Sequence, residues 1–117
     1  MKMIVAIVRP ERLEAVQAAL NECDVYLMTV SDVRGCGRQR GYTEIYRGTE
    51  FQIRLLPKLK LEIAVNDAFV QATIEAIVHA ARTGETGQIG DGKIFVLPLE
   101  DAIRIRTGEC GGQAIGP

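Results

Sequence analysis

Glycine and arginine are concentrated in residues 33–41, which read Val-Arg-Gly-Cys-Gly-Arg-Gln-Arg-Gly. Glycine allows the backbone to turn sharply and to present N–H groups to an anion. The planar guanidinium of arginine matches the oxygens of a phosphate or a carboxylate. The composition of this segment therefore predicts an anion-binding loop.

The same segment opens a long polar excursion that ends near Lys58. It has roughly twenty residues between two apolar stretches, whereas connections in compact domains are typically ~4–6 residues long. Loops of this length are usually functional or disordered, and the glycines and arginines at its base favour a recognition loop over a floppy insertion.

A second group of residues with the same chemistry lies in the C-terminal third of the chain. Gly90-Asp91-Gly92-Lys93 offers backbone donors and an ammonium to an anion. Arg104 and Arg106 alternate within a predicted strand, so both would point to one face and could hold one polyphosphate. The ordinary alternatives are a plain turn and two solvated arginines. A P-loop enzyme is excluded because Ile94 replaces the required serine or threonine and a strand pattern follows.

Composition argues against several other classes of function. Fourteen basic and fifteen acidic residues leave a net charge of −1, so no general attraction to nucleic acid or membranes is expected. No apolar run is long enough for membrane insertion. The three cysteines have no metal-site spacing, and no carboxylate pair or nucleophile with a neighbouring base is visible. We therefore expect a cytoplasmic protein that is not an enzyme.

The pattern of apolar residues predicts the elements that must position these groups. Strands are expected at 3–8, 25–33, 59–65 and 93–99, with a short last one at 103–107. Helical spacing follows Pro10 and continues to Cys23, and a second helix capped by Asn66-Asp67 continues to Ala81. We expect one domain over residues 1–109 and a flexible C-terminal tail at 110–117.

This order predicts an α+β, ferredoxin-like βαββαβ sandwich with the long loop between strands 2 and 3. Both helices would cover one face of an antiparallel sheet. The other face needs a cover because its strands are apolar on both sides, and a symmetric homo-oligomer is the simplest one. An RNA-binding sheet is disfavoured because no aromatic residues alternate on a central strand.

Five motifs make the chain resemble the PII signal-transduction proteins of nitrogen regulation: residues 35–41, 46–51, 56–58, 89–96 and 103–108. The similarity covers residues 1 to about 109 in one register. It implies a homotrimer whose intersubunit clefts bind ATP or ADP, and in which Mg²⁺ and ATP allow 2-oxoglutarate to bind. The long loop, about residues 37–55, would then control partner proteins, such as an ammonium transporter or enzymes of nitrogen metabolism.

The resemblance also implies a role for individual residues. The nucleotide-binding positions are Ile7, Thr29, Gly35, Gly37, Arg38, Glu62, Gly90, Asp91, Gly92, Lys93, Arg104 and Arg106. Lys58 and Gln39 match the 2-oxoglutarate-binding residues, and the side-chain oxygen of Gln39 would also join the Mg²⁺ shell. Arg47 matches the arginine that enters the exit of an ammonium transporter, and Phe51 is expected at the partner contact.

Two departures from the family pattern qualify these expectations. The segment from Thr83 to Lys93 is three residues longer than usual, which puts its phosphate geometry in doubt. Phe51 replaces the tyrosine that many relatives modify, so ligands alone are expected to switch this protein; phosphorylation of Thr49 stays open. The alternative is a PII-like regulator that binds adenine nucleotides but senses another small anion, such as bicarbonate. Gln39 and Lys58 argue against it.

Overall fold

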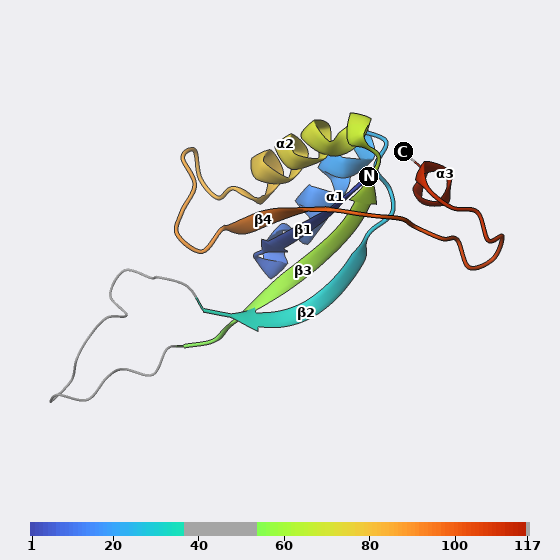
Figure 1. Cartoon of the computed structure of the whole chain (residues 1–117). Helices are drawn as coiled ribbons and strands as arrows, with labels where there is room; N and C mark the ends of the chain where they lie inside the picture. The colour runs from blue at the N-terminus through green and yellow to red at the C-terminus, as the bar shows by residue number, and fades with distance from the viewer. Residues whose placement is uncertain (37–53, 117) are drawn as a thin grey trace, which may run out of the picture.

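The computed structural model describes residues 1–36 and 54–116. Figure 1 shows its elements, which follow one another as β1 (Lys2–Val8), the 3₁₀ turn η1 (Pro10–Arg12), α1 (Leu13–Glu22), β2 (Thr29–Gly35), β3 (Leu56–Val65), the 3₁₀ turn η2 (Asp67–Phe69), α2 (Val70–Ala81), β4 (Gly92–Pro98) and α3 (Gly112–Ile115).

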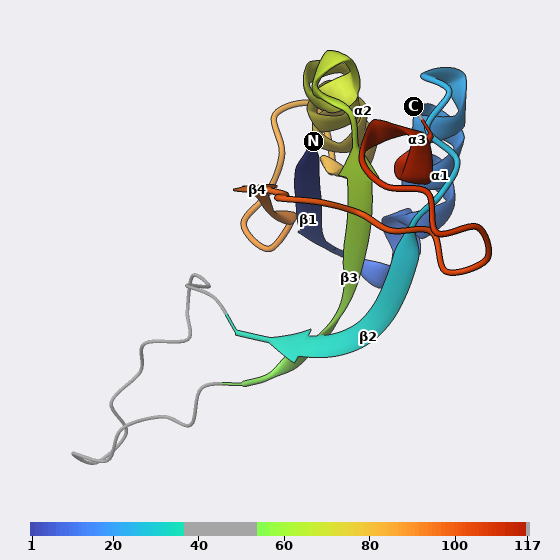
Figure 2. The ribbon, with the colours of Figure 1, turned by 45° about the vertical axis from the view of Figure 1, so that its right-hand side comes forward.

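The four strands form one antiparallel sheet in the order β2-β3-β1-β4. Helices α1 and α2 lie side by side on the same face of this sheet (Figures 1 and 2). Alternate residues of the central strands, such as Ile4 on β1 and Leu61 and Ile63 on β3, are fully buried beneath Val16 of α1 and Ile77 of α2. This arrangement confirms the predicted ferredoxin-like α+β fold.

The opposite face of the sheet is apolar over β1 and β4. Because Ile4, Ala6 and Val8 point towards the helices, the intervening residues of β1 point away from them. The β1–β4 register places Phe95 and Leu97 beside these residues, and their side chains are 51% and 46% exposed. We call this surface the open apolar face; it consists of Met3, Val5, Ile7, Phe95 and Leu97.

The connections show why the helices begin and end where they do. Pro10 occupies the first position of η1, where its missing N–H costs no hydrogen bond. Arg12 donates from Nε and Nη2 to the carbonyl of Ala80 at 2.9 and 2.6 Å. This contact ties the beginning of α1 to the end of α2, where the glycine-rich loop of residues 82–91 begins.

Asn66 does not cap the second helix with its side chain, so that prediction is wrong. It stands at the N-cap position of η2, but its side-chain amide donates to the carbonyls of Gly112 and Gly116 instead. The neighbouring Asp67 accepts a hydrogen bond from the N-terminal ammonium at 2.8 Å. These two residues therefore bind the two ends of the chain.

The predicted last strand at 103–107 is also wrong. Ile103 forms only an isolated bridge with Cys110, and residues 105–107 form a turn. The N–H of Gly108 donates to Arg104 at 2.7 Å, and the N–H of Arg104 donates to Glu109 at 2.8 Å, so the segment bonds to itself. Residues 110–116, expected to be a tail, contain α3. Among the described residues, no helix is both long and apolar enough to cross a membrane.

Candidate functional site

A cavity of about 570 Å³ opens at the end of the sheet where β2 and β3 meet the start of β4. This volume suits a small-molecule ligand, because such sites typically measure ~300–1,000 Å³. It brings together six of the eleven predicted nucleotide and effector residues that the structure describes: Ile7, Gly35, Lys58, Gly90, Gly92 and Lys93. Residues from the start, the middle and the end of the chain therefore meet at one place.

The loop between α2 and β4 forms one wall of this cavity, and Asp91 organises it. The Asp91 carboxylate accepts hydrogen bonds from the N–H and hydroxyl of Thr83 at 3.0 and 2.6 Å, and from the N–H of Gln88 at 2.8 Å. It also pairs with Nε of Arg9 at 3.0 Å. Because its oxygens are occupied in this way, Asp91 serves the cavity by holding the loop in shape.

The environment of Asp91 makes the loop sensitive to acid. Burial alone would raise the pKa of Asp91, but the hydrogen bonds from Thr83 and Gln88 and the Arg9 guanidinium outweigh it and hold that pKa well below its ordinary value of 3.8. A carboxylate with a lowered pKa in the folded state stabilises the fold above its unfolded pKa. That stabilisation is lost as the pH falls below this value.

We expect Asp91→Asn to lower the free energy of unfolding by about 1–3 kcal/mol at neutral pH, because it leaves Arg9 without its charged partner. Urea unfolding should be measured for Asp91→Asn and the unaltered protein from pH 7 to pH 2.5. The difference between their free energies of unfolding should become smaller below pH ~4. Glu85→Gln, which removes an exposed carboxylate from the same loop, is the control and should have little effect. A difference in free energy of unfolding that stays constant down to pH 2.5 would contradict this account.

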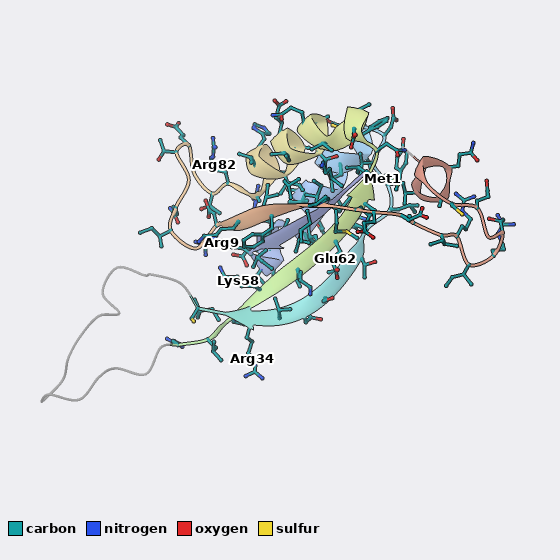
Figure 3. All side chains as sticks on the ribbon, in the orientation of Figure 1. Met1, Arg9, Arg34, Lys58, Glu62 and Arg82 are labelled. Atoms are coloured by element: carbon teal, nitrogen blue, oxygen red, sulfur yellow. The ribbon has the colours of Figure 1, made fainter. Side chains whose placement is uncertain are left out.

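Two cations hold successive carbonyl groups of the same loop. Arg9 Nη2 donates to the carbonyl of Ile89 at 2.9 Å, and Lys58 Nζ donates to that of Gly90 at 2.5 Å. The two side chains lie close together at the loop end of the sheet (Figure 3). Burial, followed by repulsion from Arg9, lowers the pKa of Lys58. An anion that enters the cavity would relieve this repulsion, so the site is electrostatically suited to a carboxylate or phosphate.

Gly92 allows the loop to pass directly against β1. Its φ of +114° is disfavoured for other residues, and a Cβ atom built on it would lie 1.7 Å from the carbonyl oxygen of Ile7. Gly92 is paired with Val8, so this contact fixes where the loop ends and β4 begins. The close approach brings the backbone of residues 90–92 to the floor of the cavity.

The remaining predicted residues are not brought to this cavity. Thr29 is paired with Glu62, and at about 3.3 Å per residue it lies roughly 20 Å along β2 from Gly35. Strand β4 runs away from the cavity, since Gly92 pairs with Val8 and Pro98 with Lys2. The segment that carries Arg104 and Arg106 therefore lies at the opposite end of the sheet (Figure 1).

Five predicted residues lie outside the described part of the chain: Gly37, Arg38, Gln39, Arg47 and Phe51. Their roles stay predictions. Within residues 1–36 and 54–116, no three His, Cys, Asp or Glu side chains gather in a way that could hold a metal ion.

Several residues of the site were not singled out from the sequence. Arg34, Cys36, Ile89 and Phe95 also line the cavity, and Arg9 holds the loop from behind. Arg34 belongs to the glycine- and arginine-rich segment, so its composition was a usable signal. Arg9 stands alone before Pro10, and only the fold brings it next to Asp91.

A second cavity of about 580 Å³ lies on the helix side of the same loop. Its wall on α2 consists of apolar side chains such as Ile74, Ile77 and Ala81. Arg82 and Lys93 also line this second cavity. The cavity with Lys58 is the better anion site because three cations line it: Arg34, Lys58 and Lys93.

The sequence of this chain is similar to known proteins over almost its whole length. The family model described as Nitrogen regulatory protein P-II matches residues 1–109. Nitrogen regulatory protein GlnK1 of Methanosarcina mazei is 56% identical over 98% of this chain and 97% of its own length. Nitrogen regulatory protein P-II of Rhodospirillum rubrum is 53% identical over 98% of this chain and 100% of its own length. Nitrogen regulatory protein P-II 2 of Methanothermobacter thermautotrophicus is 54% identical over 98% and 97%, respectively.

Proposed function

Because this chain belongs to the nitrogen regulatory protein P-II family, it is a regulatory signalling protein and not an enzyme, and we propose that it senses nitrogen and carbon status through bound ligands. The proposed ligands are ATP or ADP, together with Mg²⁺ and 2-oxoglutarate. They would bind in clefts between the subunits of a cytoplasmic homotrimer.

The observation that carries this proposal is the cavity at Lys58. Lys58 and Lys93 supply two ammonium groups, and residues 90–92 bring glycine-rich backbone to the same place. Such a site favours an anion with several oxygens, and its volume leaves room for the rest of a nucleotide. No step of bond making or breaking is required of these residues, in keeping with a sensor.

The division of the predicted residues between the two ends of the sheet supports a site shared by two subunits. Lys58 and Gly90 lie at one end, whereas Arg104 and Arg106 lie beyond the other. A polyphosphate could contact both groups only if they come from different chains. A closed ring of chains would provide this arrangement and would also cover the open apolar face.

Assembly can be tested without ligand. We expect light scattering of the purified protein at micromolar concentration to give three times the chain mass of 12.8 kDa. Leu97→Glu places a charge on the open apolar face and should reduce the mass towards that of one chain, because an unpaired charge is costly to bury. Val78→Glu makes the same change on an exposed residue of α2 and should leave the mass unchanged. A monomeric unaltered protein would contradict the shared cleft.

The proposed output of the sensor is the long loop between β2 and β3. It would engage an ammonium transporter or an enzyme of nitrogen metabolism, with Arg47 and Phe51 at the contact. The names of the relatives support a role in nitrogen regulation and leave the partner of this chain open.

Nucleotide binding is the first requirement of this function. We would titrate ATP and ADP into the unaltered protein by calorimetry, with Mg²⁺ present for ATP. Saturable binding of one nucleotide per chain is the expected result. If neither ATP nor ADP binds, the proposed function is refuted.

A further inference from the structure

The cavity of about 580 Å³ between α2, the loop of residues 82–91 and the start of β4 has the size of a small-molecule site, typically ~300–1,000 Å³. We call it the helix-side cavity. It is lined by aliphatic side chains of α2 and β4: Ile74, Ile77, Val78, Ala81 and Ile94. Burial of an aliphatic chain against this wall would be favourable, whereas the polar groups of a nucleotide base would find few partners there.

Two cations line the same cavity, and the structure leaves both without a partner. Gly87 has no side chain, so the stem of Arg82 can lie against the loop; a Cβ atom on Gly87 would be 3.2 Å from Cγ of Arg82. The side chains of Arg82 and Lys93 make no hydrogen bond or ion pair within residues 1–36 and 54–116. Figure 3 shows Arg82 where the loop leaves α2.

Among the described residues that line the helix-side cavity, only Asp91 is acidic. Its carboxylate oxygens already accept hydrogen bonds from Thr83 and Gln88, and Arg9 balances its charge. Asp91 therefore offers little repulsion to an entering anion. The planar guanidinium of Arg82 matches the two oxygens of a carboxylate. Together, the wall and the cations suit a ligand with an aliphatic body and a carboxylate head.

We infer that the helix-side cavity is a second effector site, which binds an aliphatic carboxylate and thereby weakens the binding of ATP in the cavity at Lys58. The carboxylate head pairs with Arg82 and Lys93, and the aliphatic body packs on α2. Binding of the carboxylate does not depend on the proposed function, but its effect on ATP rests on it.

The coupling follows from the residues that the two cavities share, which are Ile7, Ile89, Gly92 and Lys93. An anion in either cavity reduces the attraction that the Lys93 ammonium offers to an anion in the other. Two anions on opposite sides of one loop also repel each other. Because linkage is reciprocal, ATP must weaken carboxylate binding by the same factor.

The test uses octanoate as the probe and 1-octanol as its uncharged counterpart. Calorimetric titration of the nucleotide-free, unaltered protein should show saturable octanoate binding. Arg82→Gln should weaken octanoate binding by about ten-fold, since one charge-assisted contact is lost, and should change 1-octanol binding little. Val78→Glu should also weaken octanoate binding because it places a carboxylate on the cavity wall. His79→Glu makes the same change in charge outside the cavity and is the control; all three residues are exposed, so the fold should persist.

The position of the bound octanoate is tested with Lys58→Ala. Its carboxylate could instead enter the cavity at Lys58, but Lys58 does not line the helix-side cavity. We therefore expect Lys58→Ala to leave octanoate binding unchanged. Saturating octanoate should weaken ATP binding to the unaltered protein by about five-fold or more. At the same octanoate concentration, Arg82→Gln should show a smaller effect on ATP.

Three results would overturn the inference: no saturable octanoate binding, an equal loss of octanoate binding in Lys58→Ala and Arg82→Gln, or the same ATP affinity with and without saturating octanoate. ATP and ADP titrations without octanoate test the proposed function separately. A protein that bound octanoate in the expected pattern but neither nucleotide would refute the proposed function and the coupling, and would leave the carboxylate site standing. The two failures are therefore distinguishable.

Discussion

Replacing Gly92 with alanine is expected to destabilise the protein by more than about 4 kcal/mol and to abolish nucleotide binding. The added Cβ would lie 1.7 Å from the carbonyl oxygen of Ile7 and 2.8 Å from its carbonyl carbon, and both are backbone atoms of a strand inside the sheet. Relief of this overlap requires the first residues of β4 to separate from β1 at the Val8–Gly92 pair. The loop that forms the cavity wall would move with them.

Gly84→Ala provides the matched control in the same loop. Gly84 has a φ of +68°, but a Cβ atom there would have no neighbour within 4 Å. Only the conformational cost of a left-handed alanine applies, about 1–2 kcal/mol. Urea unfolding and ATP titration of both variants separate backbone strain from steric overlap. Equal unfolding midpoints for the two variants would show that the approach of Gly92 to β1 does not constrain the loop.

Replacing Lys58 with alanine should weaken 2-oxoglutarate binding strongly while ATP binding persists, because Lys93 and the glycine-rich backbone of residues 90–92 remain to hold the nucleotide. Lys58 Nζ is the ammonium that reaches the carbonyl of Gly90, and its position between β3 and the loop places it inside the cavity. Burial and the nearby Arg9 already lower the pKa of Lys58, so an entering carboxylate gains a partner that is partly stripped of water. Loss of such a charge-assisted contact weakens binding by about ten- to a hundred-fold.

Lys60→Ala controls for the loss of one positive charge on the same strand. Lys60 lies two residues further along β3, and its ammonium is 4.0 Å from Glu62. We expect it to leave 2-oxoglutarate binding unchanged in a calorimetric titration at saturating ATP and Mg²⁺. An equal loss of affinity in the Lys58 and Lys60 variants would point to a general charge effect and against a specific contact at Lys58.

The fold was predictable because its signals are local and repeated. Strand β1 follows from a continuous β-branched run, and α1 follows from Pro10 and the spacing of Leu13, Val16 and Leu20. The order of these elements then fixes the ferredoxin-like sheet. The strand ends were less accurate: β2 begins at Thr29 and not at residue 25, after the left-handed turn at Asp24.

The C-terminal segment could not be predicted in the same way. Alternation of isoleucine and arginine at 103–106 is typical of a strand, but the hydrogen bonds of Arg104 with Glu109 and α3 fold the segment on itself. The role of Asn66 was missed for the same reason, because its partners at Gly112 and Gly116 are far away in the sequence. Contacts between residues that are distant in the sequence determine the fold of the C-terminal segment and the partners of Asn66. Such contacts cannot be predicted from local sequence patterns.

The candidate site was predictable in its chemistry but only partly in its geometry. Glycines and cations marked Gly35, Lys58 and residues 90–93, which the fold gathers around one cavity. The role of Asp91 as the internal anchor of the loop depends on Arg9 and Thr83, and only the structure brings these three together.

The central claim is tested most directly by titrating 2-oxoglutarate into the protein under three conditions: without nucleotide, with saturating ATP and EDTA, and with saturating ATP and Mg²⁺. We predict saturable binding only in the third condition, because 2-oxoglutarate is proposed to complete the coordination of a Mg²⁺ ion that ATP already holds. Strong binding to the nucleotide-free protein, or no binding in any of the three, would contradict the account.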